Sequence, residues 1–406
     1  MKNKLILLVL FALFSISGCV KTDEGQIKES AGETSIQKKA DYEQISEDIL
    51  ASENESVTEN DFIIDWQDEN LEDAMREITG ITNRDIMLSD VIGIEELNLY
   101  SIEVENIDSL KYLTNLRELH LVSGKYMPNG TSMSILKNDD PLDLSALSHL
   151  TKLKSLSMQG KKIKDIKPLA NLQGLECLSF CGGGGLSIFP VMVSDISPLA
   201  GLTNLKILNM PSTQVTNINA LANLTNLERL DLSNNRIADI TPLINLKQLT
   251  WLQLNGTDVV DINGLGILSQ LENLDLGNTH IIQIDPLKDL VHLETLNLYN
   301  TDIIDLSVLT DLPQLKHLGF HGANVTDFDT LKYLTHLISL DLSQTGISDI
   351  SFLQNMTMLE ELYLPNNTIT DISSLSNLTN LKFLDISGNP IVDYSPVSFV
   401  ETVYKD

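Results

Sequence analysis

Residues 224–245 read LTNLERLDLSNNRIADITPLIN, and this stretch is the unit from which the chain is built. Its apolar pattern starts at Leu224 and starts again at Leu246. The same start recurs every 22 residues along the C-terminal half of the chain, at Leu202, Leu224, Leu246, Leu268, Leu290, Leu312, Leu334, Met356 and Leu378. A fixed period of this length predicts stacked, similar turns in which each turn contacts only its neighbours.

The spacing inside one repeat predicts its elements. In Leu230-Asp231-Leu232 the leucines alternate with a polar residue, which is the pattern of a strand with one buried face. The pattern L-x-x-L-x-L-x-x-N is typical of leucine-rich repeats. The sequence therefore predicts an α/β repeat fold. We expect a leucine-rich-repeat solenoid with a curved parallel β-sheet on its concave face and 3₁₀ or short turns on its convex face.

Polar residues recur at two further positions of the repeat. Asn235 is replaced in other repeats by Thr213, Thr257, Thr279, Thr301, Thr345, Asn367 and Asn389, and we expect these side chains to bond backbone groups at the bend after each strand. An Asp before the next Ile recurs as Asp165, Asp195, Asp239, Asp261, Asp305, Asp327, Asp349 and Asp371. A short acceptor there can cap a 3₁₀ turn, whose first residues suit Pro168, Pro198, Pro242 and Pro286. We interpret these Asp residues as structural, with calcium binding as the alternative.

Toward the N-terminus the pattern continues, but its spacing widens twice. Its earlier starts are Val91, Leu113, Leu150 and Leu172. We therefore predict about 13 repeats over residues 91–391, with insertions near 123–143 and 182–191. Residues 392–406 are predicted to form a C-terminal cap, in which Tyr394, Val397 and Val400 join Ile391 in covering the last layer.

Residues 61–90 are predicted to cover the first layer as a helical N-terminal cap. Asp68 or Asn70 can begin a helix whose apolar face carries Leu71, Ala74, Met75 and Ile78, and Gly80 can end it. Phe62, Ile63 and Trp66 are expected to pack on the first turn. We assign Trp66 to the core, with a ligand platform as the alternative.

The chain begins with two lysines and an apolar run from Leu5 to Ile16, which predicts a secretory signal in residues 1–18. The ending Ile16-Ser17-Gly18-Cys19 resembles the bacterial lipoprotein signal. That resemblance implies a diacylglyceryl group on Cys19 and anchoring on the extracytoplasmic face of a bacterial cell membrane. The alternative is an ordinary cleaved signal with an incidental cysteine. Residues 19–60 are acidic and lack an apolar period, so we predict a disordered tether, which the resemblance implies is lipidated at Cys19.

The 22-residue repeat also resembles that of internalin-type bacterial surface proteins, together with the cap residues Asp61-Phe62, Trp66 and Leu71-Glu72-Asp73-Ala74. The match covers residues 61 to about 400. This resemblance implies a curved sheet that binds a host or envelope protein. The chain lacks the LPxTG sorting signal and the immunoglobulin-like domain of the wall-anchored members. We therefore expect partner binding rather than invasion.

Charge and cysteines limit the function further. The net charge is −29, which disfavours nucleic acid, because non-specific binding there depends on Lys and Arg. We interpret the acidity as a solubilising surface. Cys177 and Cys181 fall four residues apart on one predicted strand, about 13 Å between Cα atoms, beyond the reach of a disulfide. We therefore predict free thiols, with a reactive or metal-binding role as the alternative.

Positions five, seven and nine after each start are expected on the exposed face of the strand. Ring-bearing side chains gather there, namely Trp251, Tyr299, His317, His321, Tyr363 and Phe383. Tyr and Trp are enriched among interface hot spots, so we predict a partner-binding patch, with scattered aromatics without a partner as the alternative. His317 and His321 lie about 13 Å apart along one strand, too far to share an ion. We predict no metal site.

A catalytic use of the same face is not expected. Asp231, Asp275, Asp341 and Asp385 occupy position seven, and the nearest are about 10 Å apart, close to the spacing in inverting glycosidases. We expect no apolar cleft that would raise a carboxyl pKa and exclude water. Gly182 to Gly185 lack the Lys-Ser/Thr of a phosphate loop. We predict no catalytic residue and no cofactor.

The resulting hypothesis is a non-catalytic, membrane-anchored, adhesion-type module that binds a host or envelope protein through its concave face. The alternative is an envelope scaffold or regulatory lipoprotein that binds cell-wall glycan or another envelope protein. Trp251, Asn255, Asn297 and Tyr299 could supply the aromatic and amide groups that a glycan needs.

Overall fold

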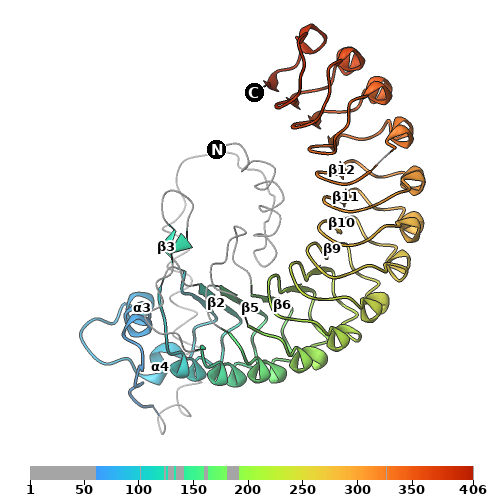
Figure 1. Ribbon diagram of the computed structural model, residues 1–406. Coiled ribbons are helices and arrows are strands. Elements are labelled where there is room, and N and C mark those ends of the chain that lie inside the picture. The colour runs from blue at the N-terminus through green and yellow to red at the C-terminus, as the bar shows by residue number, and fades with distance from the viewer. Residues whose placement is uncertain are drawn as a thin grey trace, which may run out of the picture.

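The computed structural model describes residues 61–405, except 101, 123–124, 127–131, 134–140, 160–162, 181–191 and 326. The predicted signal, the tether, Cys19 and Cys181 lie outside the described residues. The described chain forms an arc of stacked turns, with strands along its inner side and short helical turns along its outer side (Figure 1). Among these residues no helix is long and apolar enough to cross a membrane.

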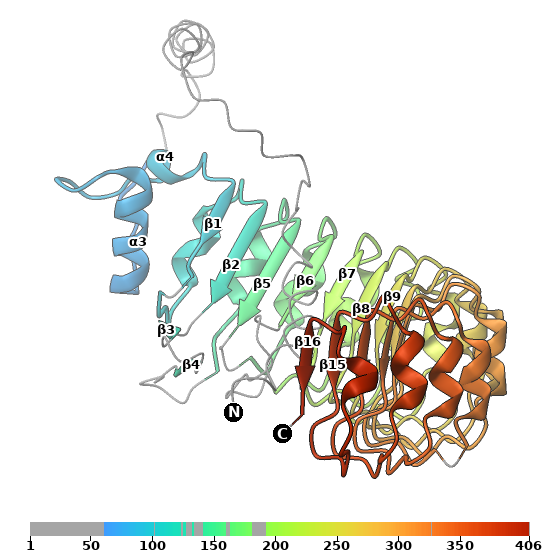
Figure 2. The ribbon, with the colours of Figure 1, turned by 90° about the horizontal axis from the view of Figure 1, so that it is seen from above.

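The inner side of the arc is one sheet of 14 parallel strands, which follow one another in sequence order (Figure 2). They are β1 (Glu96–Asn98), β2 (Glu118–Val122), β5 (Ser155–Gln159), β6 (Cys177–Ser179), β7 (Ile207–Asn209), β8 (Arg229–Asp231), β9 (Trp251–Gln253), β10 (Asn273–Asp275), β11 (Thr295–Asn297), β12 (His317–Gly319), β13 (Ser339–Asp341), β14 (Glu361–Tyr363), β15 (Phe383–Asp385) and β16 (Thr402–Tyr404). The first predicted insertion carries an antiparallel pair, β3 (Lys125–Tyr126) and β4 (Ser132–Met133). The predicted parallel sheet is confirmed.

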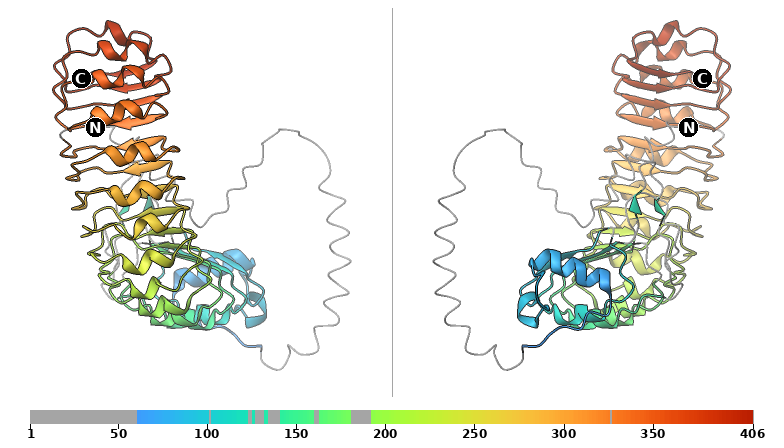
Figure 3. Two further views of the ribbon diagram at one scale, coloured as in Figure 1. Left: turned by 90° about the vertical axis from the view of Figure 1, so that its right-hand side faces the viewer. Right: turned by 90° about the vertical axis from the view of Figure 1, so that its left-hand side faces the viewer.

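The outer side carries one 3₁₀ turn per repeat (Figure 3). These are η2 (Asp108–Tyr112), η3 (Ser145–His149), η4 (Lys167–Asn171), η5 (Ser197–Gly201), η6 (Asn219–Leu221), η7 (Thr241–Asn245), η8 (Leu265–Ile267), η9 (Asp285–Asp289), η10 (Ser307–Asp311), η11 (Asp329–Tyr333), η12 (Ser351–Asn355), η13 (Ser373–Asn377) and η14 (Ser395–Val397). Between the two sides lies a continuous apolar core. Leu230 and Leu232, for example, are fully buried.

The recurring Asp residues cap the 3₁₀ turns, as predicted. Oδ1 of Asp239 accepts a hydrogen bond from the backbone N of Thr241 at 2.9 Å. The same contact, between the Asp and the residue two positions later, is made by Asp165, Asp195, Asp261, Asp305, Asp327, Asp349 and Asp371. Proline occupies one of the first two positions of η4, η5, η7 and η9. These carboxylates therefore have a structural role in every case.

A left-handed backbone recurs ten residues after each start from Leu202 onward. This position is filled by Ser212, Asn234, Gly256, Asn278, Asn300, Gly322, Gln344, Asn366 and Gly388, all with positive φ. Glycine has no Cβ to clash there, and Asn tolerates this region better than most residues. The chain therefore bends at the same point in each of these nine turns.

Asn at the position of Asn235 links neighbouring turns. Its Nδ2 donates to the carbonyl oxygen of Met210 in the preceding turn at 2.8 Å and to that of Leu232 in its own turn at 3.0 Å. Asn367 and Asn389 make the corresponding pairs of bonds. Thr at this position donates to a carbonyl of its own turn, as Thr257 does to that of Leu254. Where the next turn carries Asn, as at Asn235, the Thr hydroxyl also contacts the amide oxygen of that Asn. The predicted backbone bonds are confirmed, and Asn adds a bond between turns.

The N-terminal layer is covered by α3 (Glu69–Thr79) and α4 (Leu88–Val91). The side chain of Asp68 caps α3 by accepting from the backbone N of Leu71, and Gly80 ends the helix with φ 72°. Trp66 is buried, as predicted. Ile78 is 48% exposed, so its assignment to the buried face was wrong, because only Leu71, Ala74 and Met75 face the core.

The N-terminal residues Phe62 and Ile63 pack less deeply than expected. Ile63 forms an isolated bridge with Met87 and remains largely exposed. The Phe62 ring stands edge-on to Tyr112 of η2, with 5.3 Å between the ring centroids. Phe62 therefore packs on the first repeat, as predicted, whereas Ile63 pairs with Met87 inside the cap and stays exposed.

The C-terminal segment does more than cover the last layer. Ile391, Val397 and Val400 are buried, as predicted, but residues 402–404 also add β16 to the sheet. The backbone N of Ile386 donates to the carbonyl of Tyr404 at 2.9 Å. The predicted cap therefore continues the sheet by one strand.

Cys177 is disulfide-bonded, so the prediction of a free thiol was wrong. The separation of 13 Å assumed an extended chain from Cys177 to Cys181, but β6 ends at Ser179. The other two cysteines, Cys19 and Cys181, lie outside the described residues. The half-cystine itself is buried, at the edge of the second insertion.

Replacing Asn235 with Ala should lower the free energy of unfolding by about 1–3 kcal/mol, because buried carbonyls in two turns would lose their donor. Replacing it with Thr should cost roughly half as much, since Thr keeps the bond within its own turn. Urea unfolding of the three proteins measures the difference. The exposed Gln248, replaced with Ala, serves as the control. Equal losses for Asn235→Ala and Asn235→Thr would show that the bond between turns contributes nothing.

Candidate partner-binding face

Where the structure describes them, positions five, seven and nine of the repeats lie on the concave face. In β9, Leu252 is fully buried while Trp251 and Gln253 on either side of it are half-buried. All six predicted binding residues lie on this face with intermediate exposure. They are not on consecutive strands, because β10 and β13 carry none of them. They fall into two groups, with the histidines between them.

The first group, here called the central cluster, comprises Arg229, Trp251, Asn255, Gly277 and Tyr299. The guanidinium of Arg229, on β8, lies 4.7 Å from the ring centroid of Trp251, on the neighbouring β9. This is a cation–π contact, of the kind that contributes about 0.5–2 kcal/mol depending on burial. Burial lowers the pKa of Arg229. Arg229 therefore fixes the orientation of the Trp251 ring.

Tyr299 is held across an intervening strand. Its ring lies over Gly277, where a Cβ would overlap the ring carbons, and its hydroxyl oxygen accepts from Nδ2 of Asn255 at 3.0 Å. Burial, and then the charge of Asp275, raises the pKa of Tyr299 to about 12. The hydroxyl therefore stays protonated at neutral pH and can still donate a hydrogen bond. Glycine at 277 makes this placement possible.

The second group, here called the C-terminal cluster, comprises Tyr363, Phe383 and Tyr404. The centroids of Tyr363 and Phe383 are 4.9 Å apart, and those of Phe383 and Tyr404 are 5.4 Å apart. The three rings come from adjacent strands, β14 to β16, and each remains partly exposed. The result is a run of tilted rings across the end of the sheet.

The two histidines lie on or just after β12, between the clusters. Burial lowers the pKa of His317, and the charges of Glu361 and Glu294 oppose this shift. His317 is therefore neutral at pH 7. A further pair of rings, Tyr100 and His120, stacks at 6.2 Å near the N-terminal end of the same face. Within the described residues, no group of three or more His, Cys, Asp or Glu side chains could hold a metal ion.

Carboxyl groups on the concave face titrate differently from the expectation. Burial raises the pKa of Asp231 and Asp341, and it raises that of Asp275 to about 7. Oδ1 of Asp275 accepts from the backbone N of Gly277 at 2.9 Å, which opposes the shift only in part. The absence of an apolar cleft, which we expect from the sequence, therefore does not keep these pKa values at their ordinary level. Neighbouring strands, rather than a cleft, supply the burial.

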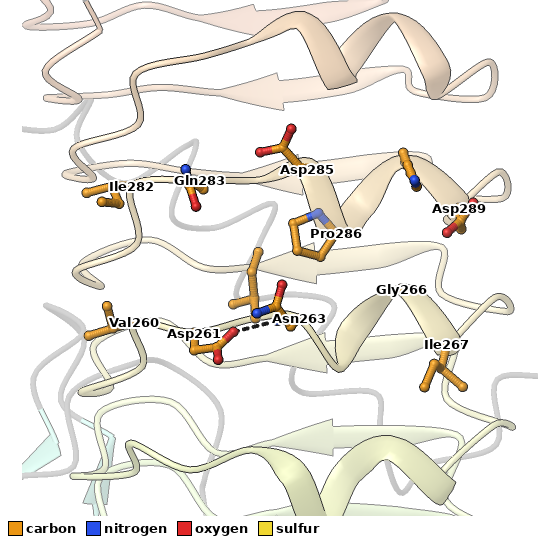
Figure 4. A pocket seen from close by; sticks show the side chains of 12 residues that line it. Val260, Asp261, Asn263, Gly266, Ile267, Ile282, Gln283, Asp285, Pro286 and Asp289 are labelled. Carbon is orange, nitrogen blue, oxygen red and sulfur yellow. Dashed lines mark hydrogen bonds between the residues drawn. The ribbon is translucent and has the colours of Figure 1, made fainter.

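A hollow of about 590 Å³ lies on the other side of the molecule, between the turns that carry η8 and η9 (Figure 4). Gly266 of η8 has no side chain, and a Cβ there would come within 2.5 Å of the Pro286 carbonyl oxygen. Val260 and Ile282 stand exposed at one edge of the hollow. Asp261, one of its acidic residues, caps the turn at Asn263. The hollow adds no group to the concave face.

Comparison with known proteins agrees with this architecture. A family model described as leucine-rich repeats (2 copies) matches residues 203–245 and 357–398. The chain is a leucine-rich-repeat solenoid. No curated protein matches its sequence.

Solved structures resemble the solenoid over most of its length. An internalin, InlF from Listeria monocytogenes, is 27% identical with a TM-score of 0.58, and the match covers 83% of this chain and 94% of that one. A leucine-rich-repeat protein from Leptospira interrogans is 22% identical with a TM-score of 0.63, covering 78% and 85%. The plant peptide hormone receptor RGFR1, in complex with RGF2, is 21% identical with a TM-score of 0.55, covering 75% of this chain and 50% of the receptor. The solenoid is thus internalin-like in its repeats and fold.

Three contributors to this face were missed from the sequence. Arg229 precedes Trp251 by one repeat at the same position, so strand register could have identified it. Tyr404 lies outside the 22-residue period, and no sequence signal pointed to its strand. Asp275 was considered only for its spacing, whereas its burial depends on side chains from other turns.

Replacing Asp275 with Asn should stabilise the solenoid at about pH 8 and have little effect at about pH 4. Between pH 3.8 and about 7 the folded chain keeps a proton that the unfolded chain releases, so stability falls as pH rises through this range. The gain above pH 7 should be a few kcal/mol at most, at about 1.4 kcal/mol per pKa unit. Urea unfolding at both pH values measures it.

Asp239 provides a control of opposite sign. Hydrogen bonds from Thr241 lower the pKa of Asp239, so its charge stabilises the folded chain above its unfolded pKa and the benefit is lost as pH falls. Asp239→Asn should therefore destabilise the solenoid at pH 8. If Asp275→Asn also destabilised it there, the carboxylate of Asp275 would be contributing favourably and the argument from burial would be wrong.

Proposed function

We propose that the solenoid is a non-catalytic, membrane-anchored interaction module that binds a protein partner through its concave face. The central cluster is the observation that carries this proposal. Trp251 and Tyr299 are held half-exposed on the sheet by Arg229 and Asn255, in positions that the apolar core does not require. Large aromatic side chains and Arg are the residue types that dominate interface energetics.

Fixed aromatic side chains favour binding because little conformational freedom is lost when a partner docks. Asn255 and Gly277 orient Tyr299, and Arg229 orients Trp251. The plant receptor shares the fold and was solved with RGF2 bound, which gives an example of this architecture in a complex. At 21% identity this similarity concerns the fold alone and does not indicate which partner this chain binds.

Binding of a cell-wall glycan is the second candidate, because Trp251, Asn297 and Tyr299 offer aromatic and amide groups. Two contacts count against it. Arg229 lies over the Trp251 ring, which leaves less of it for a sugar to stack on, and Nδ2 of Asn255 already donates to Tyr299. An envelope protein or a host protein remains the partner that fits this face better.

Replacing Trp251, Tyr299 and Tyr363 together with Ala should weaken partner binding by about 100-fold or more, since each removes a hot-spot type of side chain. The loss of affinity is measured with the immobilised full chain, as saturable binding of host-cell proteins, of envelope proteins and of purified wall polysaccharide. Circular dichroism should be unchanged. As a control, Tyr333→Ala removes an exposed ring from the convex side. A protein complex that survives the triple substitution would refute the proposal, and capture of polysaccharide alone would favour the second candidate.

Anchoring through Cys19 is part of the proposal and has its own test. The Cys19→Ala protein should lose its lipid and leave the membrane fraction, because two or more acyl chains are needed for stable anchoring. Fractionation of expressing bacteria, together with labelling by a radioactive fatty acid, distinguishes the two proteins. Membrane association and labelling that persist in Cys19→Ala would exclude this anchor.

A further inference from the structure

The C-terminal end of the concave face combines the C-terminal cluster with three carboxylates, and together they are called the C-terminal patch: Asp341, Glu361, Tyr363, Phe383, Asp385 and Tyr404. Strand register places Asp341 opposite Tyr363, Tyr363 opposite Asp385, and Asp385 opposite Tyr404. One row across four strands therefore alternates between carboxylate and ring. Glu361 and Phe383 form the neighbouring row.

Each carboxylate of the patch retains capacity for a partner. Oδ1 of Asp385 accepts from Ser387 Oγ at 2.6 Å, and Oδ1 of Asp341 accepts from the backbone N of Ser343 at 2.8 Å. Glu361 Oε2 accepts only long bonds, from Ser339 Oγ at 3.3 Å and the Tyr363 hydroxyl at 3.5 Å. In the part of the chain that the structure describes, no ion pair joins any of the three to a Lys or Arg.

The nearest lysines are engaged elsewhere. Lys382, which precedes Phe383, pairs through its Nζ with Glu360 at 2.6 Å. Lys405, which follows Tyr404, has its Nζ 4.6 Å from the centroid of the Tyr394 ring. Two histidines lie within electrostatic range of the carboxylates, His317 of Glu361 and His321 of Asp341. Burial, followed by the charges of Glu361, Asp341 and Asp385, raises the pKa of Tyr363. The patch thus places carboxylates that form no ion pair with Lys or Arg beside rings that remain partly exposed.

We infer that the C-terminal patch binds basic side chains, Lys or Arg, from an extended segment of the protein partner. A cation over the rings gains cation–π attraction, and the carboxylates supply charge-assisted hydrogen bonds. An apolar occupant would bury the carboxylates without partners, which is unfavourable, and an acidic one would be repelled. The net charge of −29 also attracts a basic segment over a longer range.

This inference rests on the proposed protein-binding function and identifies the chemistry of the partner at one end of the face. It can be tested without the natural partner. The probe is a synthetic peptide in which Arg alternates with Thr, and the matched peptide carries neutral citrulline in place of each Arg. Isothermal titration with the full chain in detergent should show binding of the Arg peptide that weakens with salt. The citrulline peptide should bind at least about tenfold more weakly.

Variants separate the patch from general attraction to an acidic protein. Glu361→Gln with Asp385→Asn should weaken binding of the Arg peptide about tenfold or more, and Tyr363→Leu should weaken it about threefold to tenfold. The matched double variant Asp258→Asn with Asp311→Asn removes the same charge from exposed positions outside the patch, and Tyr333→Leu removes a ring from the convex side. Both controls should bind as the unaltered chain does. Urea unfolding confirms that each variant is folded.

Two results would overturn the inference: equal binding of the two peptides, or equal weakening by the patch variant and the charge-matched control. Neither result would contradict the proposed function if partner binding still depended on Trp251 and Tyr299. If binding of the protein partner were unchanged in all concave-face variants, the proposed function would be refuted, regardless of how the two peptides bind.

Discussion

Parallel pairing in constant register links every turn of the solenoid to the next. Leu230 lies opposite Leu208 on one side and Leu252 on the other, and these leucines are buried in all three turns. A slip of one residue would move the leucines to the exposed face and bury the polar residues between them. The burial of this column therefore fixes the register. The register, in turn, determines which side chains meet on the concave face.

The sequence predicted the features that depend on residues within one repeat. The alternation around Leu230 predicted the strands, and the position of Asp239 predicted the capped turns, because both patterns reflect contacts within a few residues. Features that depend on other turns were harder to predict. The raised pKa of Asp275 reflects burial by neighbouring strands, and the disulfide of Cys177 contradicts the free thiol that the strand spacing predicted.

The candidate binding face shows the same division. Position within the repeat correctly placed Trp251 and Phe383 on the concave side, since period-2 alternation determines the direction of a side chain. It did not show that the predicted residues form separate groups. That grouping comes from contacts between strands, such as that of Arg229 with Trp251, and from Tyr404 on a strand outside the period. Comparing the same position in neighbouring repeats would have predicted the contact of Arg229 with Trp251, because the two residues lie opposite each other on adjacent strands.

The stacking of similar turns also controls the distance between the two aromatic clusters. Adjacent strands in a sheet are about 4.8 Å apart, so the path along the curved sheet from β9, which carries Trp251, to β15, which carries Phe383, is a whole number of such steps. Because each turn contacts only its neighbours, gain or loss of one complete 22-residue turn would change that separation by one step and preserve each cluster. The spacing of the clusters can therefore change in evolution independently of their composition, and partners of different length become accessible to the same pair of clusters.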